Sequence, residues 1–150
     1  MISIKKQLIV EAPLDRTFRV FTAKMGAWWP KSHHIGKSPL ADCVIEPKVG
    51  GRWYEVDDDG STCDWGKVLT WDPPRRVVLA WQLDQEFSYD PEFVTEVEVN
   101  FTTLGPKQTR VDFEHRHLER FGEAAERLRE NMGKGWAEIL ESYVQTAREA

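Results

Sequence analysis

The sequence of 150 residues predicts an α+β domain in which a curved antiparallel sheet wraps around a long C-terminal helix. Between residues 42 and 118, β-type segments alternate with short turn sequences, and strands joined by short turns pair antiparallel. After them, one apolar stripe at helical spacing runs to the end of the chain. Because a sheet must bury one face, this helix is the large element left to cover it, and residues 1–150 are expected to form a single domain.

The N-terminal part is expected to supply one strand, two short helices and a loop. Residues 3–11 are β-branched and apolar with polar partners, which indicates a strand. Residues 13–22 carry apolar side chains at helical spacing behind an initial proline, which the first turn of a helix tolerates. A second short helix is predicted over 24–29, ending at Pro30, and residues 31–41, which contain Gly, Pro and Ser, are expected to form a loop.

Six strands are expected to follow, separated by turn residues. Valine and phenylalanine alternate with polar residues over 97–101, which indicates a strand with one buried and one solvated face. Gly50-Gly51 predicts a bulge or a left-handed turn that bends the sheet, and Gly66 predicts a close backbone approach beneath the helix. The six predicted strands are 42–46, 52–57, 62–72, 75–84, 93–104 and 107–118.

The last element is predicted as a helix over 121–147. Its apolar residues recur at steps of three and four, and charged residues occupy the opposite face. Gly133 and Gly135 lie inside this pattern, where each costs about 1 kcal/mol relative to alanine. We expect them to let the helix approach the sheet closely. The predicted order is strand, two helices, six strands, helix.

Composition and charge exclude several classes of protein. Hydrophobic residues make up 41% and charged residues 30%, the balance of an ordinary globular protein. The net charge of −5 disfavours binding of nucleic acid, which depends on lysine and arginine side chains. Cys43 and Cys63 form no CxxC motif, so two reduced thiols are expected. No segment has the character of a signal peptide or approaches the ~20 apolar residues of a membrane helix, so a cytoplasmic protein without membrane contact is expected.

Several longer motifs carry a resemblance to a known superfamily. They are Ala12-Pro13 with Phe18 and Phe21, Gly50-Gly51-Arg52-Trp53-Tyr54-Glu55, Cys63-Asp64-Trp65-Gly66-Lys67-Val68, Trp71-Asp72-Pro73-Pro74-Arg75-Arg76 through Trp81, Val111-Asp112-Phe113-Glu114-His115, and Gly135-Trp136 with Leu140. Over nearly its whole length the chain resembles the START-like (SRPBCC) superfamily. More closely, it is similar to bacterial proteins related to the C-terminal domain of the heat-shock protein 90 ATPase activator. The resemblance implies the helix-grip fold, but no single function, because the superfamily hosts transport, cyclisation, co-chaperone and regulatory roles.

The sheet and the last helix define the walls of an internal pocket. Seven tryptophans must fill the core, line this pocket or form a surface. Core filling is the better explanation for any single tryptophan, whereas the whole set favours an aromatic-lined pocket with a few polar groups. The resemblance implies that Trp53 and Glu55 share the inward face. The expected ligand-binding residues are Trp28, Trp53, Glu55, Trp65, Trp81, Phe101, Phe113, His115, Met132 and Trp136.

Two titratable residues are candidates for chemistry in the pocket. If Val111 and Phe113 face inward, the period of two carries His115 and His117 inward as well. Glu55 and His115 could then act as a general acid and base. Burial is expected to raise the pKa of the glutamate and to lower that of the histidine, while attraction between the two groups opposes both shifts. A structural pair, or two groups that only orient a ligand, is the favoured explanation.

No cofactor and no metal ion are expected. His33 and His34 are adjacent on a loop, and no histidines or cysteines have a recognisable zinc spacing. No GxSxG, P-loop or GxGxxG motif is present. Asp64 beside Cys63 is expected to raise the pKa of the thiol, so this cysteine is expected to be inert.

The favoured function is the binding of a small apolar or aromatic molecule, without chemistry. One alternative is a co-chaperone-like interaction domain, with Trp29, Trp71 or Tyr54 exposed as a contact patch. A chaperone partner is the less favoured of the two, because no counterpart of the eukaryotic activators' additional N-terminal domain is expected. A cyclase- or hydrolase-like enzyme that uses the acid/base pair, and a homodimer, remain open.

Overall fold

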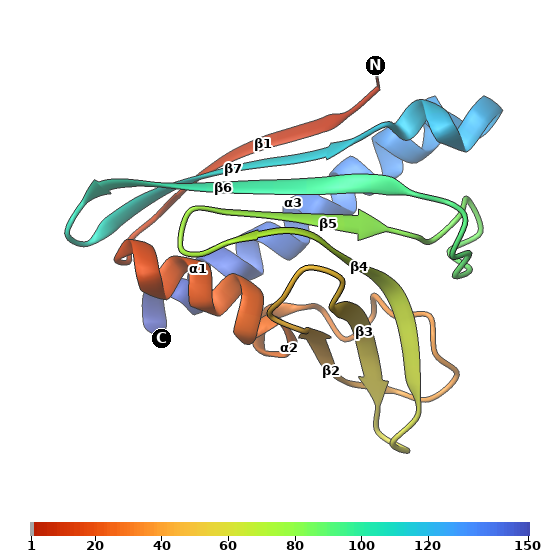
Figure 1. Cartoon of the computed structure of the whole chain (residues 1–150), viewed down its shortest axis with the longest axis horizontal. Coiled ribbons are helices and arrows are strands. Elements are labelled where there is room, and N and C mark those ends of the chain that lie inside the picture. The colour runs from red at the N-terminus through yellow and green to blue at the C-terminus, as the bar shows by residue number, and fades with distance from the viewer. Residues whose placement is uncertain (1) are drawn as a thin grey trace.

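The computed structural model describes residues 2–150 and contains a seven-stranded antiparallel sheet in the order β1-β7-β6-β5-β4-β3-β2. The first strand pairs with the last, and the other neighbours in the sheet are neighbours in sequence (Figure 1). The strands are β1 (Ile4–Val10), β2 (Leu40–Ile45), β3 (Arg52–Asp57), β4 (Thr62–Asp72), β5 (Arg76–Trp81), β6 (Thr95–Gly105) and β7 (Gln108–Arg116). The helices are α1 (Leu14–Ala23), α2 (Met25–Trp28), the 3-10 helix η1 (Leu118–Ala124) and α3 (Ala125–Glu149). The predicted α+β architecture and element order are confirmed.

The sheet bends where β4 changes register with both of its neighbours. The register shifts opposite Trp53 and Tyr54 on the β3 side, and between Val68 and Thr70 on the β5 side. An extra residue on one strand of an antiparallel pair bends that strand and increases its twist. Accordingly, β2, β3 and the first part of β4 turn away from the plane of β5, β6 and β7, as Figure 1 shows.

The glycine predictions have mixed outcomes. Gly50 has a φ of 82°, which is the left-handed turn expected before β3. Gly66 does lie at a close backbone approach, but its neighbour is β5 and not the helix: a Cβ there would stand 1.7 Å from the carbonyl oxygen of Ala80. The role predicted for the helix glycines is wrong. A Cβ on Gly133 would meet no atom within 4 Å, and one on Gly135 would make only an ordinary contact at 4.0 Å.

Helix α3 lies against the sheet and its apolar face forms much of the core. Its buried residues are Ala125, Leu128, Met132, Trp136, Ile139, Leu140, Tyr143 and Ala147. The Tyr143 hydroxyl donates a hydrogen bond of 2.7 Å to the carbonyl oxygen of Thr17 and so ties α3 to α1. The predicted start at residue 121 is wrong, because Gly122 has a non-helical backbone (φ 68°, ψ −134°) that separates η1 from α3. No described helix combines the length and the apolar character that a membrane span requires.

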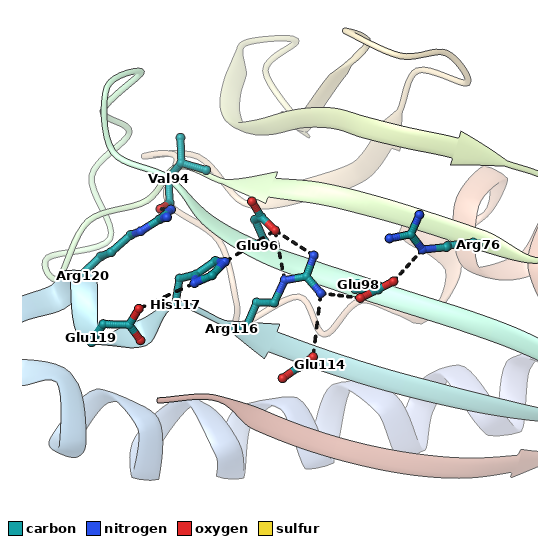
Figure 2. Close-up of polar contacts among 9 residues, drawn as sticks. All are labelled: Arg76, Val94, Glu96, Glu98, Glu114, Arg116, His117, Glu119 and Arg120. Atoms are coloured by element: carbon teal, nitrogen blue, oxygen red, sulfur yellow. Dashed lines mark hydrogen bonds and ion pairs between the residues drawn. The ribbon is translucent and has the colours of Figure 1, made fainter. Parts of the chain in front are cut away.

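Strand β7 ends at Arg116, two residues earlier than predicted, because His117 adopts a left-handed φ of 66°. The prediction that His117 faces inward is therefore wrong. Its imidazole lies 3.8 Å from a Glu96 carboxylate oxygen and 3.6 Å from one of Glu119 (Figure 2). Strand β5 likewise ends at Trp81 and not at residue 84.

The side of β6 and β7 that faces away from α3 carries a network of ion pairs, which Figure 2 shows. Arg116 pairs with Glu96 at 2.8 Å and also contacts Glu98 and Glu114. Arg76 on β5 extends the network through Glu98 at 2.5 Å. The intervening residues of β6 are buried. Charged and apolar residues thus alternate along the strands, and the apolar side chains face α3 and form the interior.

Candidate functional site

A cavity of about 340 Å³ lies between the sheet and α3. Small-molecule pockets typically measure ~300–1,000 Å³, so this cavity is at the lower end of that range. Four parts of the chain form its walls: the loop after α2, β4 with β5, the stretch that follows β5, and α3. The lining residues are Trp29, Ser32, His33, His34, Ile35, Trp65, Trp81, Leu83, Phe87, Leu128, Asn131, Met132, Gly135, Trp136 and Ile139.

Four tryptophans form the apolar walls of the cavity, and their rings contact one another. The Trp29 ring centroid lies 4.9 Å from that of Trp65 and 5.7 Å from that of Trp136. Trp81 and Trp136 are also 5.7 Å apart. Aromatic rings at such separations stabilise one another. The apolar part of the site is therefore formed before any ligand arrives.

The polar lining gathers where the loop after α2 meets α3. The polar side chains are those of Ser32, His33, His34 and Asn131. The Trp29 indole N–H donates a hydrogen bond of 2.7 Å to the carbonyl oxygen of His33, and Ser32 Oγ lies 2.9 Å from His33 Nδ1. The His33 ring reaches α3 at Gly135, one turn from Asn131. The cavity thus has an apolar body with one polar region.

The ten residues expected to bind a ligand divide into two groups. Trp65, Trp81, Met132 and Trp136 line the cavity. The other six are buried but lie outside its lining: Trp28, Trp53, Glu55, Phe101, Phe113 and His115.

Three of the six residues outside the lining pack against other aromatic rings. Trp28 packs on Tyr143 with ring centroids 5.0 Å apart, and Phe101 packs on Phe18 at 5.1 Å. Phe113 supports the cavity wall from behind, 4.6 Å from Trp136. The structure therefore assigns these side chains to the core or to the layer behind the wall.

Trp29 lines the cavity but is not among the ten residues expected to bind a ligand. The alternative that exposes Trp29 on a contact patch is wrong for this residue, because Trp29 is only 5% exposed. Trp71 and Tyr54, the other two patch candidates, are half-buried. Helix α2 ends at Trp28, and the backbone of the next residue is extended (φ −70°, ψ 126°). The two adjacent tryptophans therefore point to different surroundings, which periodicity alone does not reveal.

His115 is held in one neutral tautomer by a chain of hydrogen bonds. The Trp136 indole N–H can only donate, and it donates to His115 Nδ1 over 3.1 Å. Nε2 must then carry the proton, and it donates to Thr95 Oγ1 over 2.8 Å. The hydroxyl of Thr95 in turn lies 3.4 Å from its acceptor, the carbonyl oxygen of Trp81. Burial lowers the pKa of His115 to about 3, as expected from its position.

Glu55 is fully buried but is held by polar partners of its own. It accepts hydrogen bonds from the backbone N–H groups of Ile35 (2.7 Å) and Gly36 (3.1 Å) and from the Trp65 indole N–H (2.9 Å). Burial raises the pKa of Glu55, as expected, but the hydrogen bonds from Asp57 and from these N–H donors outweigh burial, so the pKa is lowered overall. Glu55 and His115 thus have separate partners, and the structure does not bring them together at the cavity.

Asp57 and His34 lie beside Glu55, and sequence reasoning missed this cluster. One ligand atom from each of the three residues lies within 4.8 Å of the others. Asp57 shares its proton with Glu55 and is buried, and both effects raise the pKa of Asp57 to about 6. A signal was available in the sequence, because residues two apart on a strand share a face. The contribution of His34 comes from the loop after α2, whose path the sequence pattern does not specify.

The two cysteines are not activated. Burial, followed by the nearby carboxylates of Asp42 and Glu55, raises the pKa of the Cys43 thiol. Burial and the charges of Glu55, Asp57 and Asp64 raise the pKa of Cys63. The thiol forms therefore persist at neutral pH, which agrees with the expectation for Cys63.

Comparison with known proteins gives a clear family signal. The family model described as "Activator of Hsp90 ATPase homolog 1-like protein" matches residues 11–147. A solved structure of an anthrahydroquino-gamma-pyrone synthase, Txn09, complexed with SUM, is 34% identical and has a TM-score of 0.69; the match covers 97% of this chain and 96% of that one. The self-sacrificing resistance protein CalC from Micromonospora echinospora is 33% identical, with a TM-score of 0.71 and coverage of 98% and 94%.

More distant structures share the fold alone. The Aha1 dimer from Colwellia psychrerythraea is 18% identical, with a TM-score of 0.68 and coverage of 99% of this chain and 97% of that one. A search of curated proteins gives no match.

Proposed function

The chain belongs to the family of activator of Hsp90 ATPase homolog 1-like proteins, in the START-like (SRPBCC) superfamily, and from this premise we propose that it binds a small, largely apolar aromatic molecule in the cavity between the sheet and α3. One observation carries the proposal: four tryptophans surround a cavity of about 340 Å³ whose polar side chains gather in one region. Flat aromatic walls favour a flat aromatic ligand, because stacked or edge-to-face rings are stabilised beyond their buried area.

The polar region adds a requirement on the ligand. The hydroxyl of Ser32, the imidazole of His33 and the amide of Asn131 can each donate or accept a hydrogen bond. A ligand that reaches them satisfies them best with a carbonyl or hydroxyl group at its edge. The name of the synthase that is 34% identical to this chain describes a fused aromatic skeleton that carries oxygen atoms, which supports the same ligand class.

Gly135 offers a direct test, because it lines the cavity and lies inside α3. Replacing Gly135 with leucine puts a side chain into the cavity and raises helix propensity, so the fold is retained. The matched control is Gly133→Leu, which makes the same change two residues away at a position that does not line the cavity.

We expect 1,8-dihydroxyanthraquinone, used as the probe, to quench the tryptophan fluorescence of the wild type and of Gly133→Leu with similar affinity. Gly135→Leu should weaken binding at least tenfold, or about 1.4 kcal/mol. Equal affinity in all three proteins would place the probe outside the cavity and contradict the proposal.

A second candidate function is catalysis on such a ligand, and the synthase relative is the observation that favours it. The candidate groups at the cavity are Ser32 and His33, which contact each other at 2.9 Å. Mass spectrometry of a bound polycyclic phenol or quinone after incubation separates the two functions. Recovery of unchanged compound supports binding alone, whereas a product lost in His33→Ala supports catalysis.

A further inference from the structure

We propose that His34, Glu55 and Asp57 form a binding site for one divalent transition-metal ion of the zinc class, at the edge of the cavity. The sequence-based expectation of no metal site rested on spacing along the chain. The fold brings these residues together from β3 and from the loop after α2. The proposal does not rest on the proposed organic ligand, although His34 also lines the cavity.

The geometry suits three ligands around one ion. His34 Nδ1 lies 3.7 Å from Glu55 Oε2. One imidazole nitrogen of His34 and one carboxylate oxygen each of Glu55 and Asp57 lie within 4.8 Å of one another. Zinc binds imidazole nitrogen and carboxylate oxygen at about 2.0–2.2 Å, so the edge of a tetrahedral site measures about 3.4 Å. Binding would therefore require the three ligand atoms to move closer together, and His34 Nδ1 and Glu55 Oε2 already lie near this separation.

Two ligand atoms are buried and receive no hydrogen bond from an N–H or hydroxyl donor. Within residues 2–150, these atoms are Asp57 Oδ1 and His34 Nδ1. Asp57 is only 2% exposed, and apart from the proton that it shares with Glu55 its Oδ1 atom has no donor. A cation coordinated by these two atoms would take the place of the missing donors.

The charge balance also favours a cation. Glu55 and Asp57 place two carboxylates side by side in the interior, and no lysine or arginine of the described chain forms an ion pair with either. Like charges at this distance disfavour joint ionisation unless a positive charge lies between them. A divalent ion supplies that charge.

The surroundings already orient the ligands. Hydrogen bonds from Ile35, Gly36 and Trp65 fix the Glu55 carboxylate, as outer-shell donors do in metal sites. Gly36 lies directly against the second carboxylate, because a Cβ there would stand 1.9 Å from Asp57 Oδ2. Since His34 also lines the cavity, a fourth ligand would come from that side.

The test is titration of chelator-treated protein with Zn²⁺, followed by calorimetry, and with Co²⁺, followed by its visible absorption. No organic ligand is present, so failure here leaves the proposed function untouched. Asp57→Asn removes one ligand charge at constant shape, and His34→Ala removes the imidazole from a half-exposed loop. His33→Ala is the matched control, since it deletes the neighbouring histidine outside the cluster.

We expect one Zn²⁺ per chain in the wild type and in His33→Ala, at least tenfold weaker binding in His34→Ala and Asp57→Asn, and a cobalt spectrum typical of four-coordination. Absence of binding in the wild type, or equal loss in His33→Ala, overturns the proposal. Should Asp57→Asn fail to fold, His34→Ala alone decides.

Discussion

His115 and His117 are two residues apart in sequence, yet they have opposite surroundings. His115 is fully buried and its two ring nitrogens are both hydrogen-bonded, to Trp136 and Thr95. His117 has a left-handed backbone and turns to the charged side of the sheet (Figure 2). A single φ angle thus separates a fully buried histidine from a half-buried one that lies beside two carboxylates. Period-two reasoning applies only as far as the strand continues.

The burial of His115 predicts a pH dependence of stability. The pKa of this residue is about 3 in the folded protein and near its ordinary value of 6.5 when unfolded. The unfolded state therefore binds more protons between these values, and stability falls as the pH falls below about 6.5. We expect a loss of about 2–3 kcal/mol in the free energy of unfolding between pH 6 and pH 4 from this group.

Urea unfolding at several pH values measures this loss. His115→Gln retains an acceptor for Trp136 and a donor for Thr95, but does not titrate, so this part of the pH dependence should disappear. His117→Gln is the control and should keep it. An imidazole signal of His115 that titrates near pH 6.5 in the native protein would contradict the assignment.

At the scale of the elements, periodicity and turn chemistry predicted most boundaries closely. Strands β3 and β4 were predicted at their observed limits, because acidic and glycine-rich turns separate them from their neighbours. The ends of β5 and β7 and the start of α3 differ from the predicted limits. There the pattern of apolar residues continues through Leu83, Leu118 and Phe121, all buried, while the backbone changes conformation. Burial alone therefore does not identify the element to which a residue belongs.

Glycine positions give the prediction at this scale. Gly66→Ala should destabilise the protein by at least ~2 kcal/mol, because the added methyl group would meet the Ala80 carbonyl oxygen and force β4 and β5 apart. Gly133→Ala should stabilise it by about 0.5–1 kcal/mol, since its Cβ meets nothing and helix propensity improves. Thermal and denaturant unfolding of the two variants measures both effects. A neutral Gly66→Ala would mean that the bulge at this point relaxes without loss.

At the scale of the whole molecule, the general position of the site was predictable but its lining was only partly so. The long helix and the buried sheet face placed a pocket between them, and Trp65, Trp81, Met132 and Trp136 do line the cavity. The remaining lining comes largely from loops, the segments 29–35 and 83–87, which carry no periodic signal. Their paths depend on long-range contacts such as the hydrogen bond from Ile35 to Glu55. Such contacts join residues 20 positions apart, beyond the reach of local pattern reasoning.

The distribution of tryptophan predicts how the whole protein fluoresces. Six of the seven tryptophans are buried to 6% exposure or less, and Trp71 is half-buried against Phe18. We expect blue-shifted emission that iodide quenches weakly, because buried indoles contact neither water nor the quencher. Trp71→Phe should remove most of the quenchable fraction, while Trp28→Phe, which alters a buried ring, should leave that fraction unchanged. Red-shifted emission that is largely accessible to iodide would show that tryptophans lie on the surface, as a protein-contact patch requires, and would argue against an aromatic-walled interior.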